Sequence, residues 1–521
     1  MDAAPLAHTS KGEVRGFRRG GTAVFLGIPF AKAPVGALRF AAPEPVEAWD
    51  GVREATTYGA TTQRGDAGIT LIPEPSVPGE ATLNVNVFAP ADAVPDAALP
   101  VLVWIHGGGF VSGSPASRWY DGDAFARDGV VTVVLSYRLG FDGFGAIEGA
   151  PANRGLRDQI AALEWVRDEI RAFGGDPARV TIAGQSAGGG SVLALMASPA
   201  ASGLFHAAMA ISPAVGAVAG STARRFADRV ARLAGVPADR DGFAGVPEER
   251  LLALQRAAQK PERGARLTGL TALLDDGLPL GPVVDGELLP AAPLDALAEG
   301  ASAEIPLVIG STDDEFTGLT ARFRAVLRLV PVPFVLAVLG LGRSRRRAYL
   351  ERTKRRGAAA VLGGYASDRV IRATVLRAAR ARAGAATWLY RFAWRSPSLG
   401  IAGHCLDVPF WFDRLGAEGV DRIAGEIPPA ALAAEMHAAA VAFARDGDPG
   451  WPAWDATTRR ARVFGAAASA PAVETDAYAD VAPLVEPAIS GVRGHFLSLR
   501  RLRGDRKRPL TREGTTIRAA G

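Results

Sequence analysis

The sequence predicts an α/β fold with a central, mostly parallel sheet flanked by helices. Two short, continuous apolar runs, residues 101–105 and 130–137, are typical of strands that are buried on both faces of a sheet. Between the later strands the apolar spacing becomes helical, most clearly in residues 155–173. Strands that alternate with helices favour a parallel sheet, because each crossover helix covers one face of it.

The expected elements follow in chain order. The first 100 residues are rich in Gly and Pro and are typical of antiparallel edge strands and loops. Strands are expected at 22–28, 83–88, 101–105, 130–137, 180–183, 207–211, 305–309 and 387–392, and helices at 155–173 and 187–197. Residues 219–300 and 318–382 are rich in Arg and Ala and are expected to be helical insertions over the C-terminal edge of the sheet, where such sheets hold ligands.

The charge of the chain is uneven, and this bears on its domains and partners. From Arg493 onward there are nine Arg or Lys residues and two acids, a charge of +7. Because the net charge of the whole chain is +5, the residues before Arg493 carry about −2. We therefore expect one domain over residues 1–490, followed by a basic, disordered tail over 491–521. Because the body is not basic, no nucleic acid partner is expected.

The cysteine count and the hydropathy pattern indicate a compartment. One cysteine excludes an internal disulfide and any multi-cysteine metal site, and it fits a reducing environment. The first 20 residues lack the apolar core of a signal peptide, and the longest uncharged apolar stretch, 329–342, is too short to span a membrane. We expect a cytoplasmic protein, with its oligomeric state left open between monomer and dimer.

The sharpest local signal is Gly-Gln-Ser-Ala-Gly at 184–188, directly after an expected strand and before an expected helix. In that context the glycines permit a sharp turn that exposes the hydroxyl of Ser186 as a nucleophile. The N-terminus of the following helix favours the negative charge that develops during attack. A plain glycine-rich strand-to-helix turn is the alternative.

A second signal is His-Gly-Gly-Gly-Phe at 106–110, immediately after the apolar strand at 101–105. Three glycines after a strand leave backbone N–H groups that converge on one oxygen, as an oxyanion hole requires. The alternatives are a flexible loop or a phosphate loop, and no Lys-Ser/Thr follows to support the latter. His106 is expected to brace the loop rather than to act as a base.

A serine nucleophile needs a base and an acid that orients it. Among six histidines, His404 lies in a loop after the expected strand 387–392, where a base can be held above the sheet. The acid is expected between the serine and the histidine in chain order, and Asp313, Asp314 and Glu315 are all candidates. Spacing alone does not choose among them, and a solvated acidic turn is the alternative.

These motifs, taken in order, resemble those of the type-B carboxylesterase family of α/β hydrolases, which includes bacterial p-nitrobenzyl esterases and the cholinesterases. The resemblance runs from about residue 12 to about residue 454. The segments that carry it are 27–40, 83–87, 104–110, 137–140, 153–159, 173–177, 180–189, 443–449 and 451–454.

The resemblance implies an α/β-hydrolase fold with helical insertions over an active-site gorge. It implies a serine hydrolase that cleaves carboxylic esters of small molecules through an acyl-enzyme, without a metal or an organic cofactor. The implied site residues are Ser186, Glu315 and His404 as the catalytic triad and Gly108, Gly109 and Ala187 as the oxyanion donors.

The chain also departs from the family pattern. Thr61 or Thr62 and Ala81 or Thr82 stand where the family has an early disulfide, which fits a bacterial, non-secreted member. The usual glycine after the acid is Phe316, and the residue after the base is Cys405, so the pocket is expected to differ in shape. Candidate pocket walls are Phe110, Phe316, Phe410 and Trp411, with ordinary core aromatics as the alternative for each.

Three other functions compete with the esterase. An amidase or carbamate hydrolase would use the same triad, and the sequence does not separate it from an esterase. A non-catalytic binding member of the family is disfavoured because all three triad residues are present. A lipase acting at an interface is suggested by the apolar residues 329–341, flanked by Arg322, Arg324, Arg328 and the arginines of 343–347, with a helix that closes over the gorge as the alternative.

Overall fold

The structure is a computed structural model. It describes residues 4–65, 70–214, 217–260, 278–318, 327, 329–353, 357–466 and 472–485. The chain divides into a compact unit, Met1–Glu486, and a second unit, Pro487–Gly521. The tail expected at 491–521 lies outside the described residues.

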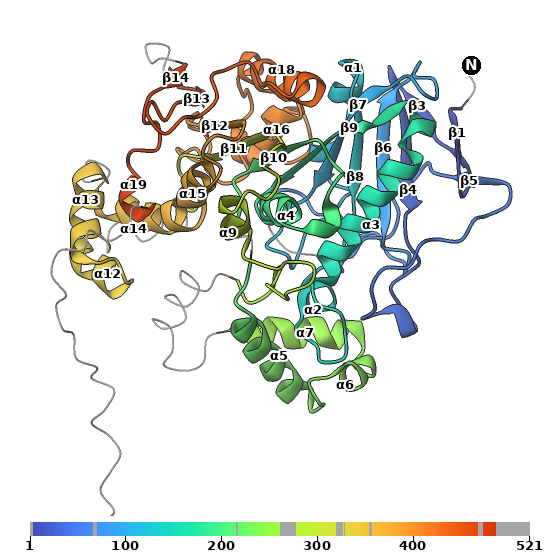
Figure 1. The fold of residues 1–521 in the computed structure, drawn as a ribbon, viewed down its shortest axis with the longest axis horizontal. Helices are drawn as coiled ribbons and strands as arrows, with labels where there is room; N and C mark the ends of the chain where they lie inside the picture. Colours follow the sequence, from blue (N-terminus) through green and yellow to red (C-terminus); the bar gives the residue numbers. More distant parts are fainter. Residues whose placement is uncertain are drawn as a thin grey trace, which may run out of the picture. The chain divides into compact units, whose positions relative to one another are not determined.

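A large sheet organises the compact unit (Figure 1). Within the described residues it has 11 strands, of which the run from β13 to β8 is parallel throughout. Their order is β14 (Val473–Glu474), β13 (Ala461–Phe464), β12 (Thr387–Phe392), β11 (Leu307–Thr312), β10 (Ala207–Ile211), β9 (Gly175–Gln185), β7 (Leu99–Ile105), β8 (Val131–Leu135), β6 (Asn84–Pro90), β4 (Thr22–Pro29) and β3 (Phe17–Arg19). The expected mostly parallel sheet is thus confirmed.

The N-terminal strands form the antiparallel edge that the sequence predicts. β6 pairs antiparallel with β8, and β4 and β3 continue the antiparallel pairing outward. A separate small sheet contains β1 (Leu6–Thr9), β2 (Gly12–Arg15) and β5 (Val52–Glu54), in which β2 and β5 are parallel. The opposite edge, β13 and β14, was not expected, because strands of four and two residues are too short to show a period.

Helices flank the sheet and occur in the described parts of both expected insertions (Figure 1). The two helices expected beside the central strands are α3 (Arg154–Glu169), continued by η3 (Ile170–Phe173), and α4 (Ala187–Met196). Residues 219–300 contain α5 (Gly220–Ala234), α6 (Arg240–Ala244), α7 (Glu248–Gln259) and α9 (Pro293–Ala298). Residues 318–382 contain α12 (Val332–Val338), α13 (Arg343–Thr353), α14 (Ala358–Ser367), the π-helix η6 (Asp368–Arg372) and α15 (Ala373–Ala381).

The remaining helices are short, apart from one. They are η1 (Gly36–Leu38), η2 (Arg118–Tyr120), α1 (Asp123–Arg127), α2 (Gly140–Phe144), η4 (Pro199–Ala201), α16 (Val408–Trp411), α17 (Val420–Ala424), α18 (Ala430–Asp446) and α19 (Ala482–Val485). Among the described residues, no helix has both the length and the apolar character needed to cross a bilayer.

The sheet separates two hydrophobic cores, because successive side chains of a strand point to opposite faces. Val101, Val103 and Ile105 of β7 join a core that includes the apolar side of α3. Leu102 and Trp104, which alternate with them, join the other core, to which α18 contributes. Burial on both faces explains why β7 is a continuous apolar run.

Candidate active site

Ser186 occupies a sharp turn between β9 and α4. Its backbone has φ 58° and ψ −118°, a combination that a residue with a side chain adopts only when its surroundings impose it. The Ser186 N–H donates to the Ile211 carbonyl at 2.9 Å, which ties the turn to the neighbouring strand β10. A Cβ at Gly188 would lie 2.0 Å from the Ile105 carbonyl oxygen, so only glycine fits there. This backbone conformation therefore explains why the side chain of Ser186 is accessible at the end of β9.

The loop after β7 lies against this turn. Gly108 and Gly109 have positive φ values of 109° and 62°, and a Cβ at Gly107 would lie 3.2 Å from the Ser186 Cβ. No hydrogen bond within the described part of the chain uses the N–H groups of Gly108 and Gly109. Ala187 is the first residue of α4, where helix N–H groups lack intrahelical partners. Free N–H donors thus come from both sides of the serine.

His106 is held as a structural part of that loop. Its buried ring stacks on Tyr137 with centroids 4.6 Å apart, and its Nδ1–H donates to the Gly107 carbonyl at 2.9 Å. The Tyr137 hydroxyl in turn donates to the His106 carbonyl at 2.9 Å. Burial lowers the pKa of His106 to about 4, so the imidazole is neutral near pH 7. This geometry fits a bracing role rather than that of a base.

His404 and Glu315 form a buried pair. The imidazole Nδ1 of His404 is hydrogen-bonded to the side-chain carboxylate of Glu315. The backbone N–H of His404 also donates to the backbone carbonyl of Glu315 at 3.0 Å. The other carboxylate oxygen accepts hydrogen bonds from the Thr312 N–H at 2.9 Å and the Ser212 hydroxyl at 2.6 Å. These four contacts fix the carboxylate at the end of β11 and the imidazole in the loop after β12.

The electrostatics of this pair favour the protonated imidazole. Burial alone would lower the pKa of His404, but its neighbours Cys405 and Glu315 raise that pKa well above its ordinary value. A base with a raised pKa is neutral only on the alkaline side of that value. The pair therefore stabilises an imidazolium that has just accepted a proton, which is what a general base requires of its acid partner.

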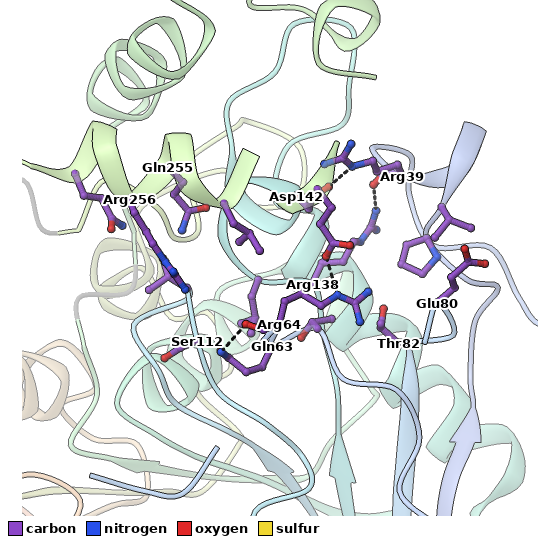
Figure 2. Close-up of a pocket in the computed structure, with 18 of the residues that line it drawn as sticks. Arg39, Gln63, Arg64, Glu80, Thr82, Ser112, Arg138, Asp142, Gln255 and Arg256 are labelled. Atoms are coloured by element: carbon purple, nitrogen blue, oxygen red, sulfur yellow. Dashed lines mark hydrogen bonds and ion pairs between the residues drawn. The ribbon is translucent and has the colours of Figure 1, made fainter. Parts of the chain in front are cut away.

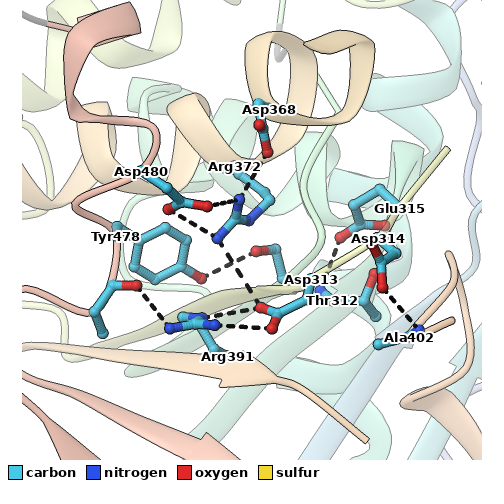
Figure 3. Close-up of polar contacts among 12 residues, drawn as sticks. Thr312, Asp313, Asp314, Glu315, Asp368, Arg372, Arg391, Ala402, Tyr478 and Asp480 are labelled. Atoms are coloured by element: carbon cyan, nitrogen blue, oxygen red, sulfur yellow. Dashed lines mark hydrogen bonds and ion pairs between the residues drawn. The ribbon is translucent and has the colours of Figure 1, made fainter. Parts of the chain in front are cut away.

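The two aspartates beside Glu315 have partners other than His404 (Figure 3). Asp313 forms a bidentate ion pair with Arg391, at 2.8 and 2.9 Å, and lies near Arg372. Asp314 accepts hydrogen bonds from the Ala402 N–H and from an exposed arginine, both at 3.2 Å. Among the three carboxyl groups that spacing left open, Glu315 is the one in contact with the imidazole.

Ser186 and His404 line one cavity of about 540 Å³. The cavity is of a size that suits a small organic molecule. Most of its wall is apolar, with Leu71, Ile72, Leu278, Leu280, Val370 and Ile371 among the lining residues. Phe110 and Phe316 also line it, and the ring of Phe316 lies 4.9 Å from that of His404. Cys405 adjoins the base on the same wall.

Phe410 and Trp411 lie in the core and not on the cavity wall. Both belong to α16 and are essentially inaccessible to solvent. Phe410 packs against Phe392 at 5.2 Å between centroids, and Trp411 packs against Tyr390 at 5.1 Å. The structure therefore corrects the expectation of a wall role for these two side chains and matches the alternative of ordinary core aromatics.

Three polar residues of the site escaped the sequence analysis. The side-chain amide of Gln185 lies 3.1 Å from His404 Nε2, the nitrogen that faces away from Glu315. Ser212 was hidden because it meets Glu315 only through the pairing of β10 with β11. Asp407 is buried and accepts a hydrogen bond from Tyr390 at 2.9 Å, and burial together with the Glu315 charge raises its pKa to about 7. The sequence signals were the position of Gln185, beside the serine, and that of Asp407, the acid three residues after His404.

A second cavity, of about 360 Å³, is polar and contains none of the predicted site residues (Figure 2). Its charged groups are largely paired: Arg39 with Asp142 at 2.7 Å and Arg64 with Glu248 at 2.9 Å. Thr70 lines both cavities, and Ser112, which follows the glycine loop, lines the polar one. The nucleophile, the base and the glycine loop meet only at the apolar cavity, which is the candidate active site.

Comparisons with known proteins point in one direction. A sequence profile described as "Carboxylesterase family" matches residues 3–329. The para-nitrobenzyl esterase of Bacillus subtilis is 36% identical over 480 residues, which are 88% of this chain and 94% of that protein. The fumonisin B1 esterase of Sphingopyxis macrogoltabida is 33% identical over 86% of this chain and 83% of its own length. The solved structure of the Geobacillus stearothermophilus carboxylesterase EST55 at pH 6.2 matches with a TM-score of 0.78 and 36% identity, covering 92% of this chain and 100% of that one.

Proposed function

The chain belongs to the carboxylesterase family and is a serine carboxylesterase of the α/β-hydrolase fold, and from that premise we propose that Ser186, His404 and Glu315 are its catalytic triad. The observation that carries the proposal is that an imidazole anchored by Glu315 and the serine of a strained turn line the same cavity. The proposed oxyanion donors are the N–H groups of Gly108, Gly109 and Ala187.

Acylation begins when the Ser186 hydroxyl attacks the ester carbonyl and His404 Nε2 takes its proton. The Glu315 carboxylate holds the Nδ1–H tautomer and stabilises the imidazolium. The carbonyl oxygen gains negative charge as the tetrahedral intermediate forms, and the three N–H groups donate to it. His404 then protonates the leaving alcohol, and the acyl group remains on Ser186.

Deacylation repeats the sequence with water as the nucleophile. His404 takes a proton from the water, the oxyanion forms in the same place, and the proton then passes to the Ser186 oxygen as the acid leaves. The strained turn keeps the Ser186 side chain accessible from the cavity, and both half-reactions need that access.

The cavity supports a preference for esters with apolar acyl or alcohol groups. Its wall is largely aliphatic, and Phe316 covers one side of the imidazole. Leu278 and Leu280 come from the first helical insertion, and Val370 and Ile371 from the second. We propose that both insertions form a cap over the site within one catalytic domain, so that the acyl and alcohol groups are selected by these apolar side chains.

A burst experiment tests the catalytic proposal. With p-nitrophenyl acetate we expect a rapid release of about one p-nitrophenol per protein, followed by slower turnover, because this activated ester acylates the serine faster than water hydrolyses the acyl-enzyme. Absence of any release from folded protein would contradict a catalytic role and would favour a non-catalytic member of the family.

Gln185→Glu is expected to move the acid limb of the pH profile of kcat/KM to higher pH. The amide of Gln185 lies 3.1 Å from His404 Nε2, so a carboxylate there would stabilise the imidazolium and raise its pKa, by about one unit or more. Since the base acts in its neutral form, activity at low pH is lost first. Gln185→Met, which adds no charge, is the matched control, and equal profiles for the two variants would show that the contact does not tune the base.

Deleting residues 503–521 is expected to leave kcat/KM for a small soluble ester unchanged within about twofold, because all proposed site residues precede that segment. The isoelectric point should fall, since the segment carries more Arg and Lys than acid. Steady-state kinetics and isoelectric focusing check both statements. A loss of about tenfold or more with an intact circular dichroism spectrum would place the tail beside the active site.

We also propose a cytoplasmic location. The support is the cysteine count: the single Cys405 lies beside the catalytic base rather than in a disulfide, which fits a reducing compartment. Fractionation of the source cells, with the protein detected by antibody, tests this, and recovery outside the cytoplasmic membrane would contradict it.

A further inference from the structure

One surface of the second insertion is apolar and faces solvent. The side chains of Leu329, Phe334 and Val338 are 87%, 67% and 44% exposed, and we call the two that belong to α12, Phe334 and Val338, the apolar face. Phe334 and Val338 are four residues apart on α12 and therefore lie on one side of it. The sequence of α12, Val-Pro-Phe-Val-Leu-Ala-Val, contains no polar side chain.

The other side of α12 is anchored. Leu336 is fully buried and, with Leu339, packs into a small core that contains Tyr349 of α13 and Tyr365 of α14. This core is separate from the two that flank the sheet. An ordinary surface helix places apolar residues on its inner side and polar residues toward water. Both sides of α12 are apolar, so packing into the small core explains the apolar residues on its inner side but not those exposed on its outer side.

Next to α12 lies a strongly basic helix. α13 contains five arginines and one glutamate, and it packs directly against α12 in the small core. Arg343, Arg347 and Arg352 are exposed, and Arg347 pairs with the single acid, Glu351, at 3.1 Å. Exposed apolar side chains beside exposed arginines are the combination that binds the surface of an anionic bilayer.

We propose that the apolar face of α12, together with the arginines of α13, docks this enzyme on anionic lipid bilayers. The apolar side chains enter the boundary between headgroups and acyl chains, and the arginines contact the lipid phosphates and other anionic headgroups. A second copy of the chain is a poorer occupant, because a two-fold pairing through α12 would bring two arginine-rich α13 helices close together. A nucleic acid would not use the apolar side chains.

The proposed docking surface lies close to the wall of the apolar cavity. Tyr365 and Val361 of α14 pack beneath α12, whereas Ala366, Val370 and Ile371, from the end of α14 and from η6, line the apolar cavity. The docking surface and the cavity wall are therefore two sides of the same helical layer. An ester dissolved in the membrane would be concentrated close to the cavity. The docking itself does not depend on the assignment of the triad.

Sedimentation with lipid vesicles tests the proposal on the full chain. We expect binding to vesicles of phosphatidylcholine with phosphatidylglycerol, weaker binding to phosphatidylcholine alone, and loss of the difference at high salt. Phe334→Ser/Val338→Ser should lower the partition coefficient about tenfold or more. The matched control is Val94→Ser/Ile427→Ser, which removes apolar side chains that are 62% and 90% exposed elsewhere, and it should bind like the wild type.

A second pair of variants separates the charge from the apolar contact. Arg343→Gln/Arg347→Gln should weaken binding to the anionic vesicles only, whereas Arg224→Gln/Arg232→Gln, which removes two exposed arginines of α5, should not. Hydrolysis of a soluble ester by every variant reports that the fold is intact. Three outcomes would overturn the proposal: no vesicle binding, binding that the α12 variant retains and deletion of 503–521 removes, or a dimer in light scattering that the α12 variant dissociates.

Discussion

Ser186→Ala is expected to abolish measurable ester hydrolysis without unfolding the protein. The hydroxyl is the proposed attacking group, and its loss should lower kcat by roughly 10⁴-fold or more, as for other serine hydrolases. The side chain faces the cavity and makes no hydrogen bond within the described part of the chain, so alanine should cost little stability. Kinetics with p-nitrophenyl acetate, beside thermal unfolding, check both parts. Retention of more than a few per cent of activity by a folded mutant would refute the assignment.

Glu315→Gln is expected to lower kcat by about a hundredfold or more, because the imidazolium loses the charge that stabilises it. The same loss removes one of the groups that raise the pKa of His404, so the acid limb of kcat/KM should move to lower pH. Both the size of the loss and the direction of the shift are read from one pH series of steady-state rates.

The neighbouring aspartates provide matched controls for Glu315. Asp313→Asn should change kcat little and should instead lower the free energy of unfolding, since Asp313 is paired with Arg391 and not with His404 (Figure 3). Asp314→Asn should have at most an intermediate effect on kcat, because Asp314 supports the Ala402 N–H in the loop that carries His404. A larger loss at Asp314 than at Glu315 would transfer the role of the acid to Asp314.

Much of the fold was predictable because the central strands are buried on both faces. Their apolar runs and the helical period between them depend on burial alone, which sequence patterns report directly. The short strands β13 and β14 were missed, since their burial depends on neighbours far away in the chain. The aromatic residues of α16 show the same limit: Phe410 and Trp411 are apolar whether they line a cavity or fill a core.

The residues of the candidate active site were also predictable only in part. Ser186 and the glycine loop were predictable because a sharp turn and a converging set of N–H groups need particular residues at fixed spacing. The choice of Glu315 rested on family resemblance, and the structure adds the contact with His404 that spacing could not give. The contact of Ser212 with Glu315 arises only when β10 pairs with β11, and that of Gln185 with His404 only when the whole sheet is assembled. No local pattern encodes them.

The most direct test of the account is to locate the acyl group on the enzyme. Acid quenching during the burst with p-nitrophenyl acetate, followed by proteolysis and mass spectrometry, should find the acetyl group on the peptide that contains Ser186. Fragmentation should place it on that serine, and no acetylated peptide should appear from Ser186→Ala. An acetyl group that is instead found on Cys405, whose thiol lies on the same cavity wall, or on any other residue, would contradict the proposed mechanism.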